Sequence, residues 1–141
     1  MSEPVLIRTK HAELTAEQVA DALPGTGEVM RAVGHCHGMA WHAARGGNWD
    51  LAAYFLRRVR SLMRGLAVTR PKYEAQLADF DREVMEPAYQ AILVRDAAAF
   101  EAAYRATVDR ANEYHVVTGH PYIRWSAPPA PPETGLDLTP G

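Results

Sequence analysis

The stretch from Glu28 to Ala67, EVMRAVGHCHGMAWHAARGGNWDLAAYFLRRVRSLMRGLA, decides the fold. Its first half repeats apolar or small residues at steps of three and four, the spacing of one helix face: Val29, Val33, Cys36, Ala40 and Ala43. Gly46 and Gly47 are suited to end this helix, and Asn48 is a suitable N-cap for the next. The stretch predicts two long amphipathic helices, over about 28–45 and 49–67, joined by a short loop.

Two more helices are expected farther along the chain. One covers about 72–94 and contains Pro87, which should kink or split it because proline lacks the N–H that a helix interior uses. The other runs from about 97 to 115–118. Short loops between long amphipathic helices favour an all-α fold, an antiparallel up-down-up-down four-helix bundle with its core at about 28–118.

The two ends of the chain differ from this central part. A short helix should begin behind Thr15, because Thr15 and Gln18 have the spacing of a capping box. No stretch alternates apolar and polar residues, so no strand is expected. The segment 127–141 is rich in proline and is expected to be a tail of polyproline character rather than a packed element. One domain is therefore expected over 1–126, followed by this tail.

Composition and charge exclude several classes of protein. The 141 residues carry a net charge of −2 and a single cysteine, Cys36, which excludes an internal disulfide and a CxxC redox pair. Near-neutral charge and the lack of a reading motif favour no nucleic-acid partner. The apolar run from Val5 to Ile7 is too short for a signal peptide or a membrane span. We expect a cytoplasmic protein with no membrane partner.

Two stretches share a pattern with a known family. The first is HGMAWHAARGGNWDLAAYFL, residues 37–56, and the second is ANEYHVVTGHPYI, residues 111–123. Together they resemble small cytochrome c′-like helical bundles of bacteria, which carry H-x-x-x-W, N-W-x-L-A-x-Y-E-L, and C-N-x-C-H followed by G-H-x-x-I. The resemblance covers about residues 30–126. It implies a haem-binding four-helix bundle and an antiparallel homodimer built on the first two helices.

The departures from this family bear on the cofactor. Ala111 and Tyr114 stand where the family has its two haem-attaching cysteines, so covalent haem c is excluded. His115 matches the histidine that would be the proximal ligand. The family's glutamate after the tyrosine of its second helix is replaced by Phe55. The resemblance thus implies a cytochrome c′-like protein that has lost covalent haem and kept the histidine.

The expected cofactor is a noncovalent haem b or a divalent transition metal. His115 lies on the apolar face of the last long helix, and a neutral imidazole there can bind haem iron or a metal ion. His37 lies beside the core row of the first long helix and is the expected second ligand. Trp41, Tyr104 and Tyr114 are expected to line a flat apolar slot. The function would be gas binding, haem handling or electron transfer.

The remaining histidines have weaker claims. His120 follows the turn after the last helix and either joins His115 and His37 in a metal site or lies on the loop surface. His35 and His42 are two turns apart, ~10 Å, too far to chelate one ion, and are expected at the surface.

A basic stripe and two other functions complete the expectations. The stripe consists of four arginines on the second long helix, Arg57, Arg58, Arg60 and Arg64. It would meet an anionic ligand or an acidic partner, or pair with acids of the neighbouring helix. In place of a cofactor, the bundle could enclose a small-molecule pocket or act as a protein-interaction module. It could also be an enzyme that uses His37, Tyr114 and His115 for acid–base chemistry.

Overall fold

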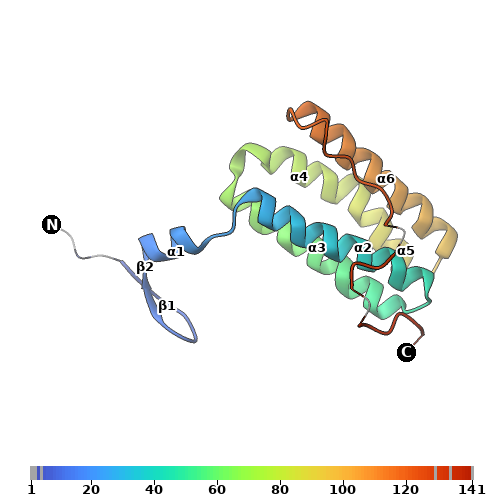
Figure 1. Cartoon of the computed structure of the whole chain (residues 1–141), viewed down its shortest axis with the longest axis horizontal. Helices are drawn as coiled ribbons and strands as arrows, with labels where there is room; N and C mark the ends of the chain where they lie inside the picture. Colours follow the sequence, from blue (N-terminus) through green and yellow to red (C-terminus); the bar gives the residue numbers. More distant parts are fainter. Residues whose placement is uncertain (1–2, 4, 129, 134, 141) are drawn as a thin grey trace.

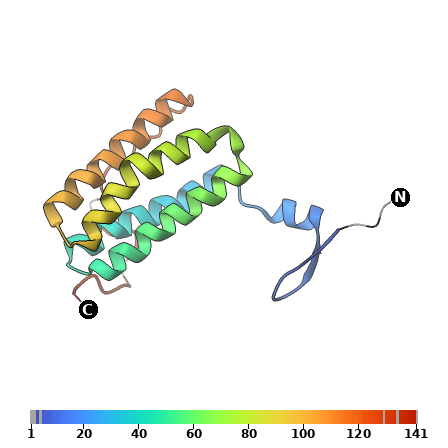
Figure 2. The same cartoon turned by 180° about the vertical axis from the view of Figure 1, so that it is seen from behind.

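A computed structural model describes residues 3, 5–128, 130–133 and 135–140 of the chain. This part is mostly helical, and its long helices pack side by side in antiparallel pairs (Figures 1 and 2). The two helices of the fold-deciding stretch are confirmed as α2 (Thr26–Arg45) and α3 (Trp49–Thr69). Gly47 turns the chain between them with φ +87°, which glycine accepts without strain. The Asn48 side chain then caps α3.

The third and fourth long helical segments also form where they were predicted. After a short turn η1 (Pro71–Tyr73), the chain runs without a break through α4 (Glu74–Phe80), η2 (Asp81–Met85) and α5 (Glu86–Leu93). The last helix, α6 (Ala97–Val117), packs against α5 and η2.

Pro87 neither breaks nor ends its helix. The residues just before it, η2, form a π-helix, and Pro87 then lies in the first turn of α5. A π-turn is one residue wider than an α-turn, and the first turn of a helix needs no N–H from proline. The predicted kink or split is therefore replaced by a local change of helix type.

A small β-hairpin at the N-terminus corrects the expectation of no strand. Strand β1 (Leu6–Arg8) pairs antiparallel with β2 (Glu13–Thr15), and Arg8 forms an ion pair with Glu13 at 2.7 Å. Each strand has three residues, too few for an apolar–polar alternation to be recognised. Helix α1 (Ala16–Ala22) follows directly, with the predicted capping box between Thr15 and Gln18.

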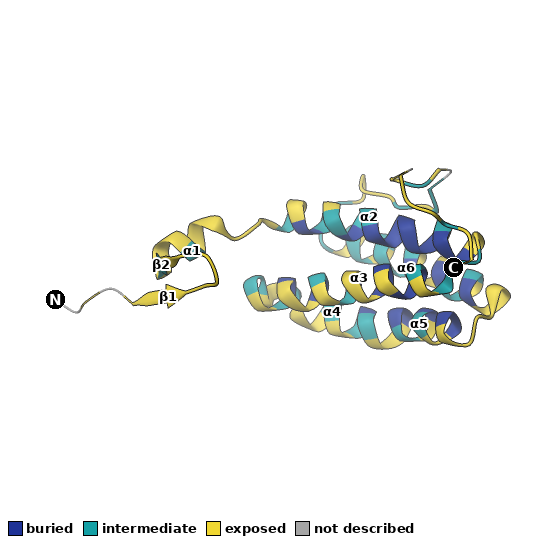
Figure 3. Ribbon diagram, turned by 90° about the horizontal axis from the view of Figure 1, so that it is seen from below, coloured by how far each residue is buried: buried dark blue, intermediate teal, exposed yellow. Residues whose placement is uncertain are grey.

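The hairpin and α1 form an arm that extends away from the long helices (Figures 1 and 3). No residue of β1, β2 or α1 is buried. The buried residues lie instead between α2, α3, α6 and the α4–η2–α5 segment, with Leu56, Met85 and Tyr104 fully enclosed. Within the described residues, no helix combines the length and apolar character needed to cross a bilayer.

The proline-rich tail packs along α2, contrary to the expectation of an unpacked segment. His42 donates a hydrogen bond from Nε2 to the Pro128 carbonyl at 2.8 Å, and Asn48 donates to the Asp137 carbonyl at 3.0 Å. A Cβ at Gly38 would lie 3.0 Å from Pro132 Cγ and 3.1 Å from Pro128 Cγ. The glycine face of α2 thus lets the tail approach closely. Residues 129, 134 and 141 of the predicted tail lie outside the described residues.

Candidate functional site

A cavity of about 360 Å³ opens at the end of the molecule where α2 begins and α6 ends. Its wall is formed by α2, α3, α4, α6 and the segment 119–125, which turns back along α6. Within the described part of the chain, the wall contains no aspartate, glutamate, lysine or arginine. This volume and apolar character are typical of a small-molecule or cofactor pocket.

The structure brings four of the predicted site residues together and leaves two elsewhere. His37, Tyr114, His115 and His120 all line the cavity. Trp41 and Tyr104 do not line this cavity. Their rings pack against each other at 4.7 Å between centroids, deeper in the bundle. Helical spacing gave the correct face for both residues, but it could not show how far along the axis the cavity reaches.

One ring nitrogen of His115 is hydrogen-bonded, and the other has no hydrogen-bond partner among the described residues. Its Nδ1 lies 3.0 Å from the Ile123 carbonyl oxygen, and a carbonyl only accepts. Nδ1 therefore carries the proton, and Nε2 of the neutral ring carries the lone pair. Gly119, with φ +87°, ends α6 and turns the chain so that Ile123 reaches His115. Metal-binding histidines commonly donate their other N–H to a carbonyl in this way.

His37 is held in a closed network of hydrogen bonds. Its Nε2 lies 2.8 Å from Thr107 Oγ1, and that hydroxyl donates its own proton to the Tyr104 carbonyl at 2.6 Å. Nε2 must therefore be the donor. The Tyr104 hydroxyl donates to the His37 carbonyl at 3.0 Å, and the two rings stack at 4.1 Å. Burial lowers the pKa of His37 to about 3, so the ring is neutral.

Three residues of the site were missed by sequence reasoning. Thr107 fixes His37, and Trp125 lines the cavity with its ring 5.6 Å from the His37 ring and 6.5 Å from that of His115. Asn112 holds Trp125 by two backbone hydrogen bonds, of 2.7 Å and 3.0 Å. Asn112 belongs to the motif 111–115, which was the available signal. The turn at Gly119 indicated that Trp125 packs back on the bundle, but not that it lines a site.

The other titratable groups do not assemble a metal centre. Within the described residues, no group of three or more His, Cys, Asp or Glu side chains could hold a metal ion. His120 lines the cavity with Nδ1 3.4 Å from Thr118 Oγ1. Cys36 is buried outside the cavity wall, and burial raises the pKa of its thiol against the opposing effect of Arg58. It packs as a small apolar residue.

His35 and His42 are only partly exposed, and both contact the tail. His35 Nε2 lies 3.6 Å from a carboxylate oxygen of Glu133, and His42 donates to Pro128 as described above. The two histidines therefore hold the tail against α2.

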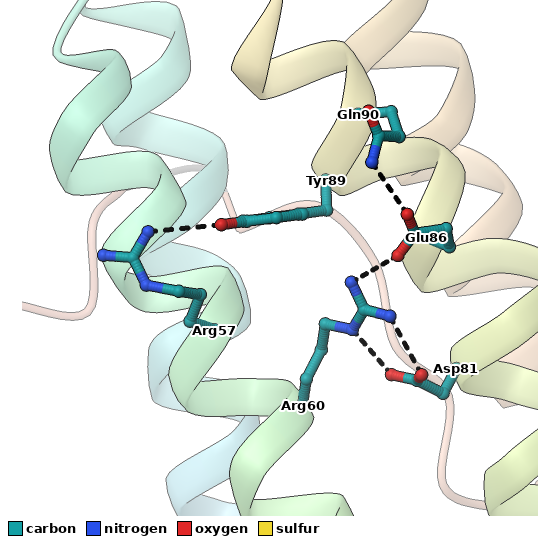
Figure 4. Close-up of polar contacts among 6 residues, drawn as sticks. All are labelled: Arg57, Arg60, Asp81, Glu86, Tyr89 and Gln90. Atoms are coloured by element: carbon teal, nitrogen blue, oxygen red, sulfur yellow. Dashed lines mark hydrogen bonds and ion pairs between the residues drawn. The ribbon is translucent and has the colours of Figure 1, made fainter.

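Two arginines of the basic stripe, Arg57 and Arg60, contact the neighbouring helical segment, as Figure 4 shows. Arg60 pairs with Asp81 through two hydrogen bonds of 2.7 and 2.9 Å and with Glu86 at 2.6 Å. The hydrogen bonds to Asp81 raise the pKa of Arg60. Arg57 donates to the Tyr89 hydroxyl at 3.3 Å. Arg60 therefore follows one of the two alternatives for the stripe, pairing with acids of the adjacent helix.

Comparison of the chain with models of known protein families, with curated proteins and with solved structures finds no match. The resemblance to cytochrome c′-like bundles therefore rests on the motif residues at 37–56 and 111–123.

Proposed function

We propose that the protein binds haem b noncovalently in the cavity at the end of the bundle, where His115 would hold its iron. The observation that carries this proposal is the hydrogen bond from His115 Nδ1 to the Ile123 carbonyl. It leaves Nε2 as a lone-pair donor in the wall of an apolar cavity of about 360 Å³. When bound, haem supplies an iron that takes a gas ligand or passes an electron.

The resembled family supports the same location. Ala111 and Tyr114, at the positions of its haem-attaching cysteines, both line the cavity beside His115. The up-down-up-down four-helix arrangement of that family is part of the proposal. Gas binding, haem handling and electron transfer are the functions that it would bring.

A bare divalent metal fits these residues less well than haem does. Haem iron needs one axial imidazole, whereas a bare ion in a protein needs several ligands. Nε2 of His37 donates to Thr107, so His37 could offer a metal only Nδ1. The residues described include no group of three or more candidate ligands.

The test is the absorbance spectrum of the protein purified from haem-replete cells and after addition of haemin. A Soret band that disappears in His115→Ala and persists in His11→Ala, on the exposed arm, is the expected result. A wild-type protein that shows no Soret band even with added haemin would overturn the proposal.

A second candidate is a cofactor-free small-molecule pocket, favoured by the absence of charged side chains from the described wall of the cavity. The propionates of haem would find no lysine or arginine there. An uncharged apolar ligand needs none. Binding of the neutral dye Nile red, lost on Ala111→Trp, would support this candidate.

For the enzyme alternative, the lowered pKa of His37 is unfavourable, because a general base works best with a pKa near the working pH.

The proposed partner is a second copy of the chain. The resemblance implies contact through α2 and α3, and exposed apolar side chains on the arm, among them Leu6 and Ile7, are a further surface that a homodimer would cover. Sedimentation velocity at two concentrations tests for the dimer, and a monomer at both would contradict it.

Arg64, which makes no hydrogen bond or ion pair with the described residues, remains open to an anionic ligand or acidic partner.

A further inference from the structure

His37 has one ring nitrogen that the network within the bundle does not use. Nε2 is bonded to Thr107, and Nδ1 forms no hydrogen bond with the described residues. In that part of the chain, every side-chain nitrogen or oxygen that solvent cannot reach has a hydrogen-bond partner. Nδ1 has none, so it is open to solvent. Since His37 is only 4% exposed and lines the cavity, Nδ1 is reached from the cavity.

The surrounding contacts fix the chemical character of this nitrogen. The Thr107 hydroxyl gives its proton to the Tyr104 carbonyl, so Nε2 of His37 carries the ring proton and Nδ1 carries a lone pair. Stacking on Tyr104 at 4.1 Å holds the ring in place. Nδ1 is thus a fixed, uncharged hydrogen-bond acceptor in an otherwise apolar wall.

The rest of the wall limits the charge of a ligand. A carboxylate or ammonium group would lose its water of hydration in the cavity and find no charged partner among the described wall residues. Aromatic rings of Phe80, Tyr114 and Trp125 line the same space and suit a flat ring. An uncharged molecule that donates a hydrogen bond would meet both the apolar wall and the acceptor.

We propose that the cavity selects an uncharged, flat apolar molecule bearing an N–H or O–H group, which donates a hydrogen bond to Nδ1 of His37. This inference rests on the second proposed function, the cofactor-free pocket, and names its ligand class. His37 is the specificity-determining residue, and Thr107 is a positioning residue that acts through it.

The test compares indole with indene by calorimetry on the full chain, because the two bicyclic rings differ at the N–H group. Their different hydration cancels when the indole-to-indene affinity ratio is compared between proteins. That ratio should fall about fivefold to tenfold from wild type to His37→Phe, the loss expected for one hydrogen bond. Indene should bind both proteins alike. His42→Phe is the matched control, because His42 also lies in α2 but contacts the tail and not the cavity, and it should keep the wild-type ratio.

A second variant covers the case in which His37→Phe does not fold, as judged by circular dichroism. Thr107→Val has nearly the same shape but removes the acceptor that keeps the His37 proton on Nε2, so the ratio should again fall. An unchanged ratio in a folded variant would overturn the selection by His37 and leave the pocket standing. Binding of neither probe to wild type would overturn both the inference and the cofactor-free pocket. The haem proposal is tested separately, by the absorbance spectrum.

Discussion

The His37 ring is almost wholly out of water, and its pKa is lowered to about 3 by that burial. In the unfolded chain the ring binds a proton near its ordinary pKa of 6.5. Between these values the unfolded state binds more protons than the folded state, so the free energy of unfolding falls as the pH falls. The expected loss is ~1.4 kcal/mol per pH unit in this window, or ~2 kcal/mol between about pH 6.5 and 5.

Urea unfolding of wild type and His37→Gln across this pH range checks the prediction. The variant has no group that titrates at this position, so its stability should depend less on pH. The same slope in both proteins would show that other groups cause the dependence.

Removing either hydroxyl of the His37 network should destabilise the protein, but not equally. Tyr104→Phe removes a donor to the His37 carbonyl, and ~1 kcal/mol is the expected cost. Thr107→Val leaves the buried Nε2–H of His37 without an acceptor, at a cost of ~1–3 kcal/mol. Denaturant unfolding of both variants measures the difference. An equal or smaller loss in Thr107→Val would mean that Nε2 is not the donor.

At the scale of single residues, the sequence could identify part of the site. Motif and helical spacing placed Tyr114, His115 and His120 near one another because all three lie within two turns of the chain. The hydrogen bond from His37 to Thr107 spans 70 positions, and its existence depends on how two helices are set against each other. That Trp125 lines the cavity was not predicted, because its place there is fixed by Asn112.

At the scale of elements, the contact between α2 and the tail depends on a glycine. A side chain at Gly38 would press on the rings of Pro128 and Pro132. Gly38→Val should therefore release the tail, seen as faster hydrogen exchange at the Glu133 amide. Gly65→Val is the control, because Gly65 also lies in a helix but has open space around it. Equal exchange at Glu133 in both variants would contradict this role of Gly38.

The π-helical segment η2 is tied to α3 by Arg60, whose side chain is 17% exposed. Arg60→Met should destabilise the protein by ~1–2 kcal/mol, between the values for exposed and buried ion pairs. Arg64→Met, on the exposed face of the same helix, should cost much less. Thermal unfolding measures both variants. Equal losses would mean that the pairing with Asp81 adds little to stability.

The helices could be predicted and the hairpin and the tail could not, for physical reasons. Helices α2, α3 and α6 have periodic apolar faces and side-chain or glycine caps, which are local signals. The hairpin is too short to show a period. The tail packs because it meets glycines more than 80 residues earlier, and a local pattern cannot report such a partner.

For the whole molecule, stability should reside in the long helices and not in the arm. An isolated two-stranded hairpin is marginal in water, and neither strand of this one nor α1 buries a residue. Leu56 is fully enclosed between the helices, so Leu56→Ala should lower the free energy of unfolding by ~2–5 kcal/mol. Ile7→Ala on β1 should change the free energy of unfolding by less than ~0.5 kcal/mol, as at most surface positions.

Hydrogen exchange separates the two parts without any substitution. Amides of β1 and β2 should exchange through local opening at little free-energy cost, while those in the middle of α2 and α3 should need global unfolding. If the proposed dimer covers the arm, its protection should rise with protein concentration, since association stabilises only the bound form. Strong protection of the hairpin at the lowest concentration would contradict an independent arm and would mean that it packs on its own bundle.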